Sequence, residues 1–565
     1  MQMTGTDKYT GETLIQCLKR QISALTTDMN SYVKHWNDLS SFIMPRSTRF
    51  FLTARNSQGN ARNTKIINAT ATMAVRTASS GLMTGITSPS RPWFNLVTGD
   101  KELNKKKEVK LWLSAVRDAM AEVFIKSNLY TTLPSVYEDL LVFGTSAFVL
   151  MEDDEDGIRC YHMPIGSYVL RTSYRGNVNG VYREFKMTVE QMVKQFGLTN
   201  CTAKVQELWR QKNYNHQIDI THCVEENPDA DEKRLESRYL PFRSIYFETS
   251  TTEDKPLSFK GLNEMAVMAP RWRVIGEDSC GVSPCMDALG DVMQLQKMEQ
   301  RKLQLLDMLL QPPRNVPVNM RNEYIGTLAG ENTFIPSSAA GSKVEPSYVP
   351  NPYLNHLEVS IQGVEQRIKH ALFEDIFLMI AEIDRGGVTA TEIQARQQEK
   401  MMVMGPVLER LNDELLDPIV RRTYAIMERA GRIPVPPPEL QDKDISVEYI
   451  SIMAQAMKLN GVVAVERLVG FIGSLAGVRP DALDKLNVDN AIDAFSDMVG
   501  TPPQLINDLN EVAEIRDVRA QQTQAANALA MAQQGADAAK TLSETQISTP
   551  SMLQAMSGAL QGGQA

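Results

Sequence analysis

The residue types that most often carry out chemistry do not form any known catalytic or metal-binding motif in this sequence. The cysteines are Cys17, Cys160, Cys201, Cys223, Cys280 and Cys285, and no two of them have the CxxC spacing of a zinc or redox site. The six histidines never pair at metal-ligand spacing, and HExxH is absent. Phosphate loops of the type GxxxxGKS or GxxxxGKT, GxGxxG after a strand and GxSxG are also absent. We therefore expect a non-enzymatic protein without cofactor or metal.

Three short features could still bind an ion or a polyanion, and each has an ordinary structural explanation. Glu152 to Asp156 could hold a cation or could be the solvated tip of a β-hairpin. Lys105 to Lys107 could contact nucleic acid or could be the charged start of a surface helix. Cys280 and Cys285 flank a turn without further ligands nearby.

Basic and acidic residues alternate along two segments near the middle of the chain. The basic members are Lys297, Arg301, Lys302, Arg367, Lys369 and His370, and the acidic ones are Glu299, Glu365 and Glu374. Exposed helix faces crossed by ion pairs explain this pattern in a single copy. If many copies formed a ring, the same residues would form rings of weak electrostatic contacts along its inner wall. Such a wall would not hold a sliding polyanion at any one level. The sequence does not separate these two interpretations.

Composition limits the class of protein. Apolar residues make up 43% and charged residues 22% of 565 residues, which is typical of globular proteins and enough for two to four domains. Lys plus Arg number 59 against 68 acidic residues, so the net charge is −9 and stable, static DNA binding is not expected. We expect no signal peptide and no membrane-spanning segment, because no apolar run reaches about 18 residues. Free thiols in a reducing cytosol are expected.

Apolar spacing predicts helices at the start of the chain and strands after them. A stripe from Leu18 to Leu39, ended by Pro45, predicts the first helix. Further helices are predicted over Ile66 to Ile86, Lys105 to Leu129 and Pro134 to Phe143, with Trp93 and Phe94 buried. Gly144 to Arg273 is predicted to be β-rich. Its expected features are a hairpin tip at Asp153 to Gly157, turns near Gly176 and at Asn179-Gly180, a short helix from Val189 to Phe196 and a last strand from Met265 to Ile275.

The centre of the chain predicts two long helices around an insertion. Ser283 caps the first, which starts with Pro284 and runs to Leu310. An insertion rich in Pro, Gly, Ser and Asn follows, with strand-like pieces at 332–335 and 343–344, and the second helix runs from Leu354 to Ile383. A third helix, with a capping box at its start and a bend at Gly405-Pro406, runs from Thr389 to Ala430. The remaining predicted helices are Ser451 to Leu475, Asp481 to Met498 and Pro503 to about Ala539.

This order of elements resembles the portal proteins of short-tailed, podovirus-type bacteriophages, the head-to-tail connecting proteins. The resemblance covers about residues 10 to 540. It is carried by SFIMP, by PSRPWFNL, by SNLYTTLPSVYEDLLVFGTSAFVL and above all by the central layout, which ends in VTATEIQARQQE. It implies an α+β, mainly α fold with a wing, stem, clip and C-terminal helical crown or barrel, assembled as a ring of twelve copies.

The resemblance also implies a domain plan. Residues 1–283 would form the N-terminal helices and β-rich wing, 284–310 and 354–383 the stem helices, and 311–353 the clip. Residues 384–388 would form the channel loop, 389–440 a wing helix and linker, 441–540 the crown or barrel, and 541–565 a low-complexity tail.

Candidate site residues follow from these positions. The channel residues facing DNA would be Arg367, Lys369, Asp384, Arg385, Gly386 and Gly387, with Arg385 the expected phosphate contact. Arg314, Arg321, Tyr324 and Lys343 of the clip would dock the terminase large subunit and later tail adaptor or nozzle proteins. This channel loop is shorter and richer in glycine than the family pattern.

By the same resemblance, the protein would sit at the portal vertex of the virion after assembly in the host cytoplasm. Its partners would be further copies of itself, the terminase, tail proteins, the major capsid and scaffolding proteins, and double-stranded DNA passing through the channel. The missing phosphate loop fits translocation driven by the terminase. Two alternatives are another oligomeric phage protein, such as a scaffold or internal head protein, and a cytosolic enzyme with an unfamiliar site. The β-rich middle and Pro-rich insertion argue against a scaffold.

Overall fold

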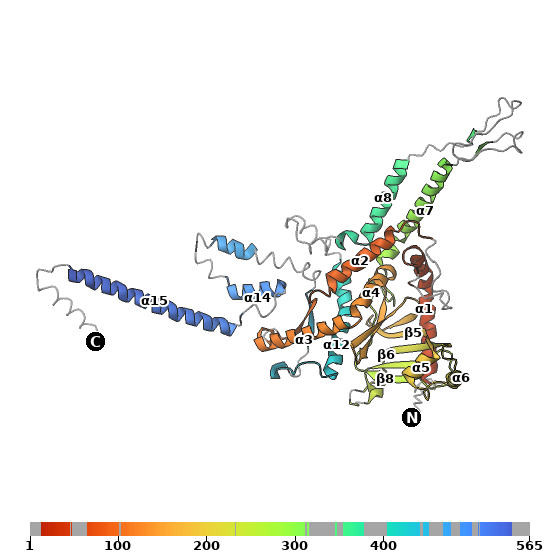
Figure 1. The fold of residues 1–565 in the computed structure, drawn as a ribbon, viewed down its shortest axis with the longest axis horizontal. Coiled ribbons are helices and arrows are strands. Elements are labelled where there is room, and N and C mark those ends of the chain that lie inside the picture. Colours follow the sequence, from red (N-terminus) through yellow and green to blue (C-terminus); the bar gives the residue numbers. More distant parts are fainter. Residues whose placement is uncertain are drawn as a thin grey trace.

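The computed structural model places a compact body between two projections, the helix pair α7 and α8 at one end and α15 at the other (Figure 1). The residues that the structure describes are 13–45, 47, 65–100, 103–231, 233–234, 236–310, 314–315, 345–346, 354–377, 404–440, 445–450, 467–475, 479, 486–499, 507 and 509–544.

Four helices build the first part of the body. They are α1 (Leu14–Phe42), α2 (Thr70–Ile86), α3 (Lys107–Lys126) and α4 (Leu129–Phe143). All four predicted helices are confirmed, although α4 begins five residues before Pro134 and contains that proline. Trp93 and Phe94 are buried as expected. Trp93 stacks on Phe124 of α3, and Phe94 contacts the same ring edge to face.

The largest sheet is antiparallel, with strand order β4-β5-β6-β7-β8. Its strands are β4 (Tyr168–Thr172), β5 (Val178–Thr188), β6 (Gln217–Glu226), β7 (Phe242–Glu248) and β8 (Ser258–Leu262). One face packs against α1 through Leu18 and Phe247. The other face is covered at one end by α5 (Val189–Phe196) and α6 (Ala203–Arg210), through residues such as Met192 and Ile220. Strand alternation thus gives the sheet two separate apolar faces.

A smaller sheet has the order β3-β2-β9, from β2 (Ala147–Asp153), β3 (Gly157–Met163) and β9 (Val267–Met268). The predicted hairpin tip between β2 and β3 is confirmed, as is the turn at Gly176. Asn179 and Gly180 lie inside β5, so the second predicted turn is wrong. The predicted strand from Met265 to Ile275 is reduced to two residues in β9. Helix α6 was not predicted.

A third pairing joins distant parts of the chain. β1 (Phe94–Thr98) is antiparallel to β12 (Ile445–Tyr449), with Leu96 opposite Val447. These five residues of β12 fall in the range 441–540 that was expected to be helical, and for them the prediction is wrong. The sequence signal for this strand is weak because its partner lies some 350 residues earlier, beyond any local pattern.

The segment before β12 is a helix interrupted by a π-helical turn. It consists of α11 (Gly405–Leu411), the π turn Asn412–Leu416 and α12 (Asp417–Arg429). Glu414 in the π turn accepts from the guanidinium of Arg271, whose side chain is 1% exposed, with Nη2–Oε1 at 2.6 Å. It also accepts from the Arg271 backbone N–H at 2.9 Å. The expected bend at Gly405-Pro406 lies at the edge of the described residues and is not tested.

The C-terminal part is helical where the structure describes it. It contains residues 467–475, α14 (Val488–Val499) and α15 (Leu509–Glu544). Arg516 of α15 donates to both carboxylate oxygens of Asp489 in α14, at 2.7 and 2.8 Å. Much of α15 lies away from the body (Figure 1), and every side chain described from Glu514 to Gln534 is exposed.

Candidate functional site

The predicted stem is a pair of antiparallel helices that projects from the body. α7 (Pro284–Leu310) has the predicted bounds, and α8 (Leu354–Ala371) lies beside it (Figure 1). Ser283 caps α7, because its hydroxyl oxygen accepts from the N–H of Met286 at 3.0 Å. Beyond the ends of both helices, β10 (Arg314–Asn315) pairs with β11 (Glu345–Pro346). The strand-like pieces predicted at 332–335 and 343–344 lie outside the described residues.

Of the predicted channel residues, the structure describes Arg367 and Lys369. Both lie on α8, and both form ion pairs within the chain. Arg367 Nη2 lies 2.9 Å from Asp291 Oδ1 on α7, and this hydrogen bond raises the pKa of the arginine. Lys369 Nζ lies 3.8 Å from Glu374 Oε2. Asp384, Arg385, Gly386 and Gly387 lie outside the described residues.

Of the predicted docking residues, the structure describes Arg314. Arg314 is in strand β10, where the structure describes only its backbone. Arg321, Tyr324 and Lys343 lie outside the described residues.

Opposite charges bridge the two stem helices at more than one level. Arg367 pairs with Asp291 near the body, and Lys302 Nζ lies 3.4 Å from Glu358 Oε1 farther along. Both pairs are largely exposed, so each contributes at most about 1 kcal/mol. We call these two contacts the stem ion pairs. They place a carboxylate beside each of these two cations.

A pair of uncharged side chains connects the stem to the body, and this contact was not predicted from the sequence. Gln296 of α7 accepts from the backbone N–H of Ile67 at 2.7 Å and of Asn68 at 2.9 Å. Asn68 Nδ2 in turn donates to Glu299 of α7 at 3.1 Å and to Glu365 of α8 at 2.8 Å. The loop before α2 is therefore tied to both stem helices. A single Gln and a single Asn carry no spacing signal that could have revealed this contact.

The second predicted stem helix is interrupted. α8 ends at Ala371, Phe373 adopts φ +58 in the left-handed region, and residues 374–377 are helical again. The predicted end at Ile383 lies outside the described residues. The break is held by packing: the Phe373 ring lies 6.2 Å from Trp272. Phe377 fits against Gly81 of α2, where an added Cβ would come within 2.4 Å of the Phe377 Cβ. Tertiary contacts thus end a helix that the local pattern favours.

The ends of the break are also joined by charges. Lys369 contacts Glu374, and His370 Nδ1 lies 3.5 Å from Asp375 Oδ2. Both pairs are five residues apart, a spacing that an unbroken α-helix places on different faces. These contacts therefore belong to the broken form.

The other features singled out by sequence have structural partners. Lys106 forms an ion pair with Glu439 at 2.7 Å, and Lys107 pairs with Glu511 in the first turn of α15. Asp153 Oδ1 accepts from the N–H groups of Glu155 and Asp156 and so shapes the acidic hairpin tip. Two of the three lysines therefore contact carboxylates of the same chain.

Within the described residues, no cluster of three or more His, Cys, Asp or Glu side chains could hold a metal. The six cysteines are free thiols, and five are buried. Burial raises the pKa of the Cys280 thiol to about 11 and of the Cys160 thiol to about 12, which disfavours the reactive thiolate. No described helix is long and apolar enough to cross a membrane.

Comparison with known proteins decides the family. Residues 16–506 match the model of the family described as bacteriophage head to tail connecting protein. The chain belongs to this family. It is 44% identical over 549 residues to the portal protein of Salmonella phage epsilon15, covering 97% of this chain and 99% of that protein. It is 38% identical over 538 residues to the probable portal protein of Bordetella phage BPP-1, covering 95% and 97%.

Solved structures show weaker likeness to this connector chain. A chain in the virion of a native gene transfer agent particle matches with 12% identity and a TM-score of 0.31, covering 69% of this chain and 88% of that one. A chain in the neck of an empty gene transfer agent particle matches with 11% identity and a TM-score of 0.35, covering 72% and 86%. At these TM-scores the structural likeness adds nothing to the sequence relationship.

Proposed function

We propose that the chain is a portal subunit, which forms with further copies the channel for packaging DNA into a phage capsid and ejecting it through the tail. Family membership and two relatives called portal and probable portal proteins, each matched over nearly its whole length, support this function. The alternative of a scaffold or internal head protein is not favoured by these relationships.

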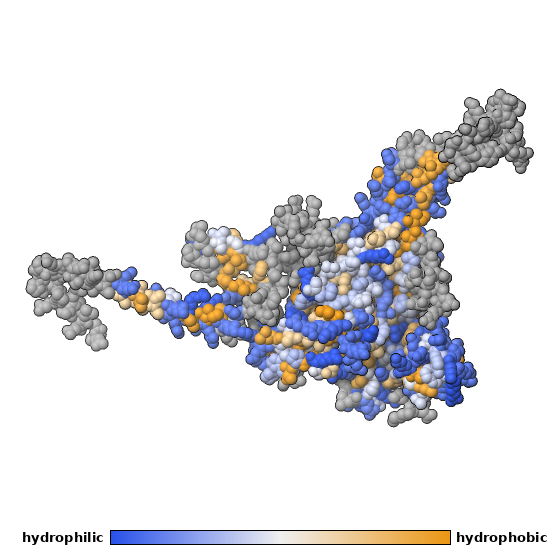
Figure 2. All heavy atoms as spheres, in the orientation of Figure 1, coloured by the Kyte–Doolittle hydropathy of each residue, from blue (hydrophilic) through white to orange (hydrophobic). Residues whose placement is uncertain are grey.

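Assembly into a ring is supported by the exposed apolar surface of the stem. Leu303, Leu310 and Val359 are 51%, 80% and 67% exposed on a helix pair that projects into solvent. Figure 2 shows apolar surface along this projection. A single copy would leave these side chains in water, which is unfavourable by about 25 cal/mol for each Å² left uncovered. In a ring, the stem of a neighbouring copy covers them. Twelve copies is the number that the family resemblance implies.

The wall of such a channel holds DNA weakly. The stem ion pairs compensate Arg367 and Lys302 within each copy, so few cations remain to bind phosphate. DNA can then slide without a deep energy minimum. The channel loop at 384–388 supplies the closest contact, with Arg385 facing a phosphate and Gly386 and Gly387 permitting movement.

The clip at 311–353 binds the terminase large subunit during packaging and a tail adaptor or nozzle protein afterwards. Arg314, Arg321, Tyr324 and Lys343 are its docking residues. The subunit itself is structural, and the terminase supplies the energy of translocation. The ring sits at one vertex, where it contacts the major capsid and scaffolding proteins after assembly in the host cytoplasm.

The C-terminal helices form a crown or barrel around the same axis. α15 has 36 residues, and its exposed side chains include Ile515, Val518 and Leu529. A long helix without packing partners is marginal in water. Neighbouring copies of α14 and α15 provide the packing that one chain lacks.

Electron microscopy of the purified protein with a matched pair of variants tests the ring. Val359→Asp places a charge on the exposed apolar surface of α8, and Ser360→Asp places the same charge on the next residue, on another face. We expect rings with a central hole from the parent and from Ser360→Asp, and single subunits from Val359→Asp. A parent protein that never forms rings, or a Val359→Asp variant that forms them as well as Ser360→Asp, contradicts the proposal.

A further inference from the structure

Arg183 of β5 is a largely buried cation without an acidic partner. It lies opposite His222 of β6, which lies opposite Tyr246 of β7, so the three side chains form a row across one sheet face. Arg183 Nε donates to His222 Nδ1 at 3.1 Å, and the guanidinium also hydrogen-bonds Tyr246. Burial lowers the pKa of Arg183, and no carboxylate in the described part of the chain compensates its charge. Buried charges in proteins are normally paired.

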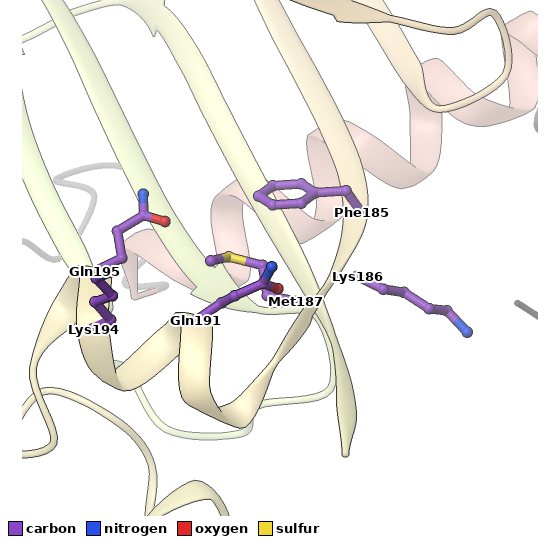
Figure 3. Close-up of a pocket in the computed structure, with 6 residues that line it drawn as sticks. All are labelled: Phe185, Lys186, Met187, Gln191, Lys194 and Gln195. Atoms are coloured by element: carbon purple, nitrogen blue, oxygen red, sulfur yellow. The ribbon is translucent and has the colours of Figure 1, made fainter. Parts of the chain in front are cut away.

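The guanidinium packs against Phe185, one of the residues that line a groove. Its Cζ is 4.4 Å from the centroid of the Phe185 ring, on the same face of β5. Phe185 and Met187 form an apolar floor, and Gln191, Lys194 and Gln195 of α5 form the opposite wall of a groove of about 440 Å³. Figure 3 shows Phe185, Met187 and Gln191 between strand and helix, whereas Lys186 extends away from them.

The rim of the groove is cationic and borders an open strand edge. No ion pair or hydrogen bond engages the Lys194 side chain within the described residues. β4 pairs with β5 as far as Arg183, and Ser167 accepts from the Glu184 N–H. From Phe185 onward, β6 is the one strand of the described part of the chain that pairs with β5. An extended segment can pair with such an open edge.

We propose that this groove binds an extended, acidic segment of another protein, with a carboxylate on Arg183 and a neighbouring apolar side chain over Phe185 and Met187. A carboxylate provides the counter-ion that Arg183 lacks, and a guanidinium can bind it through two N–H groups. None of these residues belongs to the stem helices α7 and α8.

Charge and shape favour another protein over a second copy. Among the described residues, an acidic run that reaches the surface is the hairpin tip from Asp153 to Gly157. It is a tight turn instead of an extended segment, and its sequence DDEDG contains no apolar side chain that could cover the groove floor. A segment that alternates acidic and apolar residues matches both the cation and the floor.

Fluorescence polarisation with the full-length protein tests this site. The probe is a labelled peptide of alternating glutamate and leucine, compared with its glutamine counterpart. Lys194→Glu places a negative charge on the rim, and Lys204→Glu makes the same change on an exposed position of α6. We expect the parent and Lys204→Glu to bind the acidic peptide alike and Lys194→Glu to bind at least about tenfold more weakly, since a charged contact is replaced by repulsion.

Two further variants separate the cation from folding. Arg183→Gln should lose about tenfold or more in affinity, but it also removes buried hydrogen bonds and can therefore disturb folding. Gln195→Glu changes an exposed residue, leaves those hydrogen bonds in place and should also weaken binding. Equal binding of the glutamine peptide, equal binding by Lys194→Glu, or no binding to the parent overturns the proposal. Mass photometry on the same proteins tests whether a second copy of the chain occupies the groove. If Lys194→Glu loses self-association and Lys204→Glu does not, the groove binds a second copy and the proposal is overturned.

Discussion

The side-chain amide of Gln296 pairs with the backbone of Asn68 in both directions, accepting from its N–H at 2.9 Å and donating to its carbonyl oxygen at 2.8 Å. Because Gln296 is buried and Asn68 also contacts both stem helices, this pair fixes the stem on the body. The stem can be a rigid element of a channel wall only if it is anchored in this way.

Removing the Gln296 amide should therefore loosen the stem. Gln296→Ala leaves two backbone N–H groups and one carbonyl without partners, which costs about 1–3 kcal/mol of unfolding free energy. Chemical denaturation measures this loss. Gln294→Ala, at an exposed position of the same helix, should change stability by less than about 0.5 kcal/mol. Equal effects of the two variants would show that the Gln296 contacts do not stabilise the structure.

Two glycine substitutions should have opposite signs. Gly81→Ala brings a methyl group against Phe377 and should destabilise the protein by about 1–3 kcal/mol through overpacking. Gly290→Ala in α7 meets no atom within 4 Å and should stabilise the protein by about 0.4–1 kcal/mol, because it restricts the unfolded chain. Thermal or urea unfolding gives both values. A stabilising Gly81→Ala would mean that α2 and the segment after α8 are not in close contact.

Backbone strain at Phe373 can be measured by comparing two variants that both remove the ring. Phe373→Gly and Phe373→Ala lose the same contact with Trp272, but only glycine adopts φ +58 without strain. We expect the glycine variant to be more stable than the alanine variant by about 1 kcal/mol. If the alanine variant is the more stable one, α8 continues through position 373 and the break is absent.

The ion pair of Arg271 with Glu414 should be worth far more than an exposed pair. Glu414→Ala removes the counter-ion of a buried guanidinium, which keeps the Gly176 carbonyl oxygen as an acceptor, and leaves the Arg271 backbone N–H without an acceptor. The loss should cost about 3–5 kcal/mol. Asp287→Ala removes the exposed partner of Arg273, 3.8 Å away, and should cost less than about 1 kcal/mol. The difference in unfolding free energy is the readout, and similar losses would place Arg271 in solvent.

Burial of His222 makes part of the stability dependent on pH. Its pKa lies well below the usual 6.5 in the folded protein because of burial and the nearby Arg183. Its contribution to stability is therefore complete above pH 6.5 and falls as the pH drops below 6.5, because only the unfolded chain then gains the proton. The slope reaches at most about 1.4 kcal/mol per pH unit.

Unfolding measured from pH 7.5 to 5 tests this dependence. His222→Gln should flatten the slope below pH 6.5, and His216→Gln, at an exposed position, should keep the slope of the parent. An unchanged slope in His222→Gln would show that the residue is protonated alike in both states.

The parts of the fold that sequence predicts well are those with local signals. α7 has the predicted bounds, and Ser283 and Pro284 start it as expected. The hairpin between β2 and β3 follows from its acidic turn and Gly157. Such features depend on neighbours in sequence.

The parts that sequence missed depend on distant contacts. α8 ends at Ala371 because Trp272 and Gly81 hold Phe373 and Phe377 in place, and no residue near Ala371 signals a stop. β12 is a strand because Phe94–Thr98 lies beside it. The predicted charged residues Arg367 and Lys369 do lie on the stem, but the contacts of Gln296 with Asn68 have no local pattern that could predict them.

We propose that many copies together form a tunnel lined by their stem helices. A cryo-electron microscopy reconstruction of the purified assembly measures the position of residues 284–310 and 354–371 relative to the symmetry axis. We expect a ring in which both helices surround the central opening and Val359 contacts a neighbouring copy. Stem helices on the outer rim, remote from any opening, would contradict it.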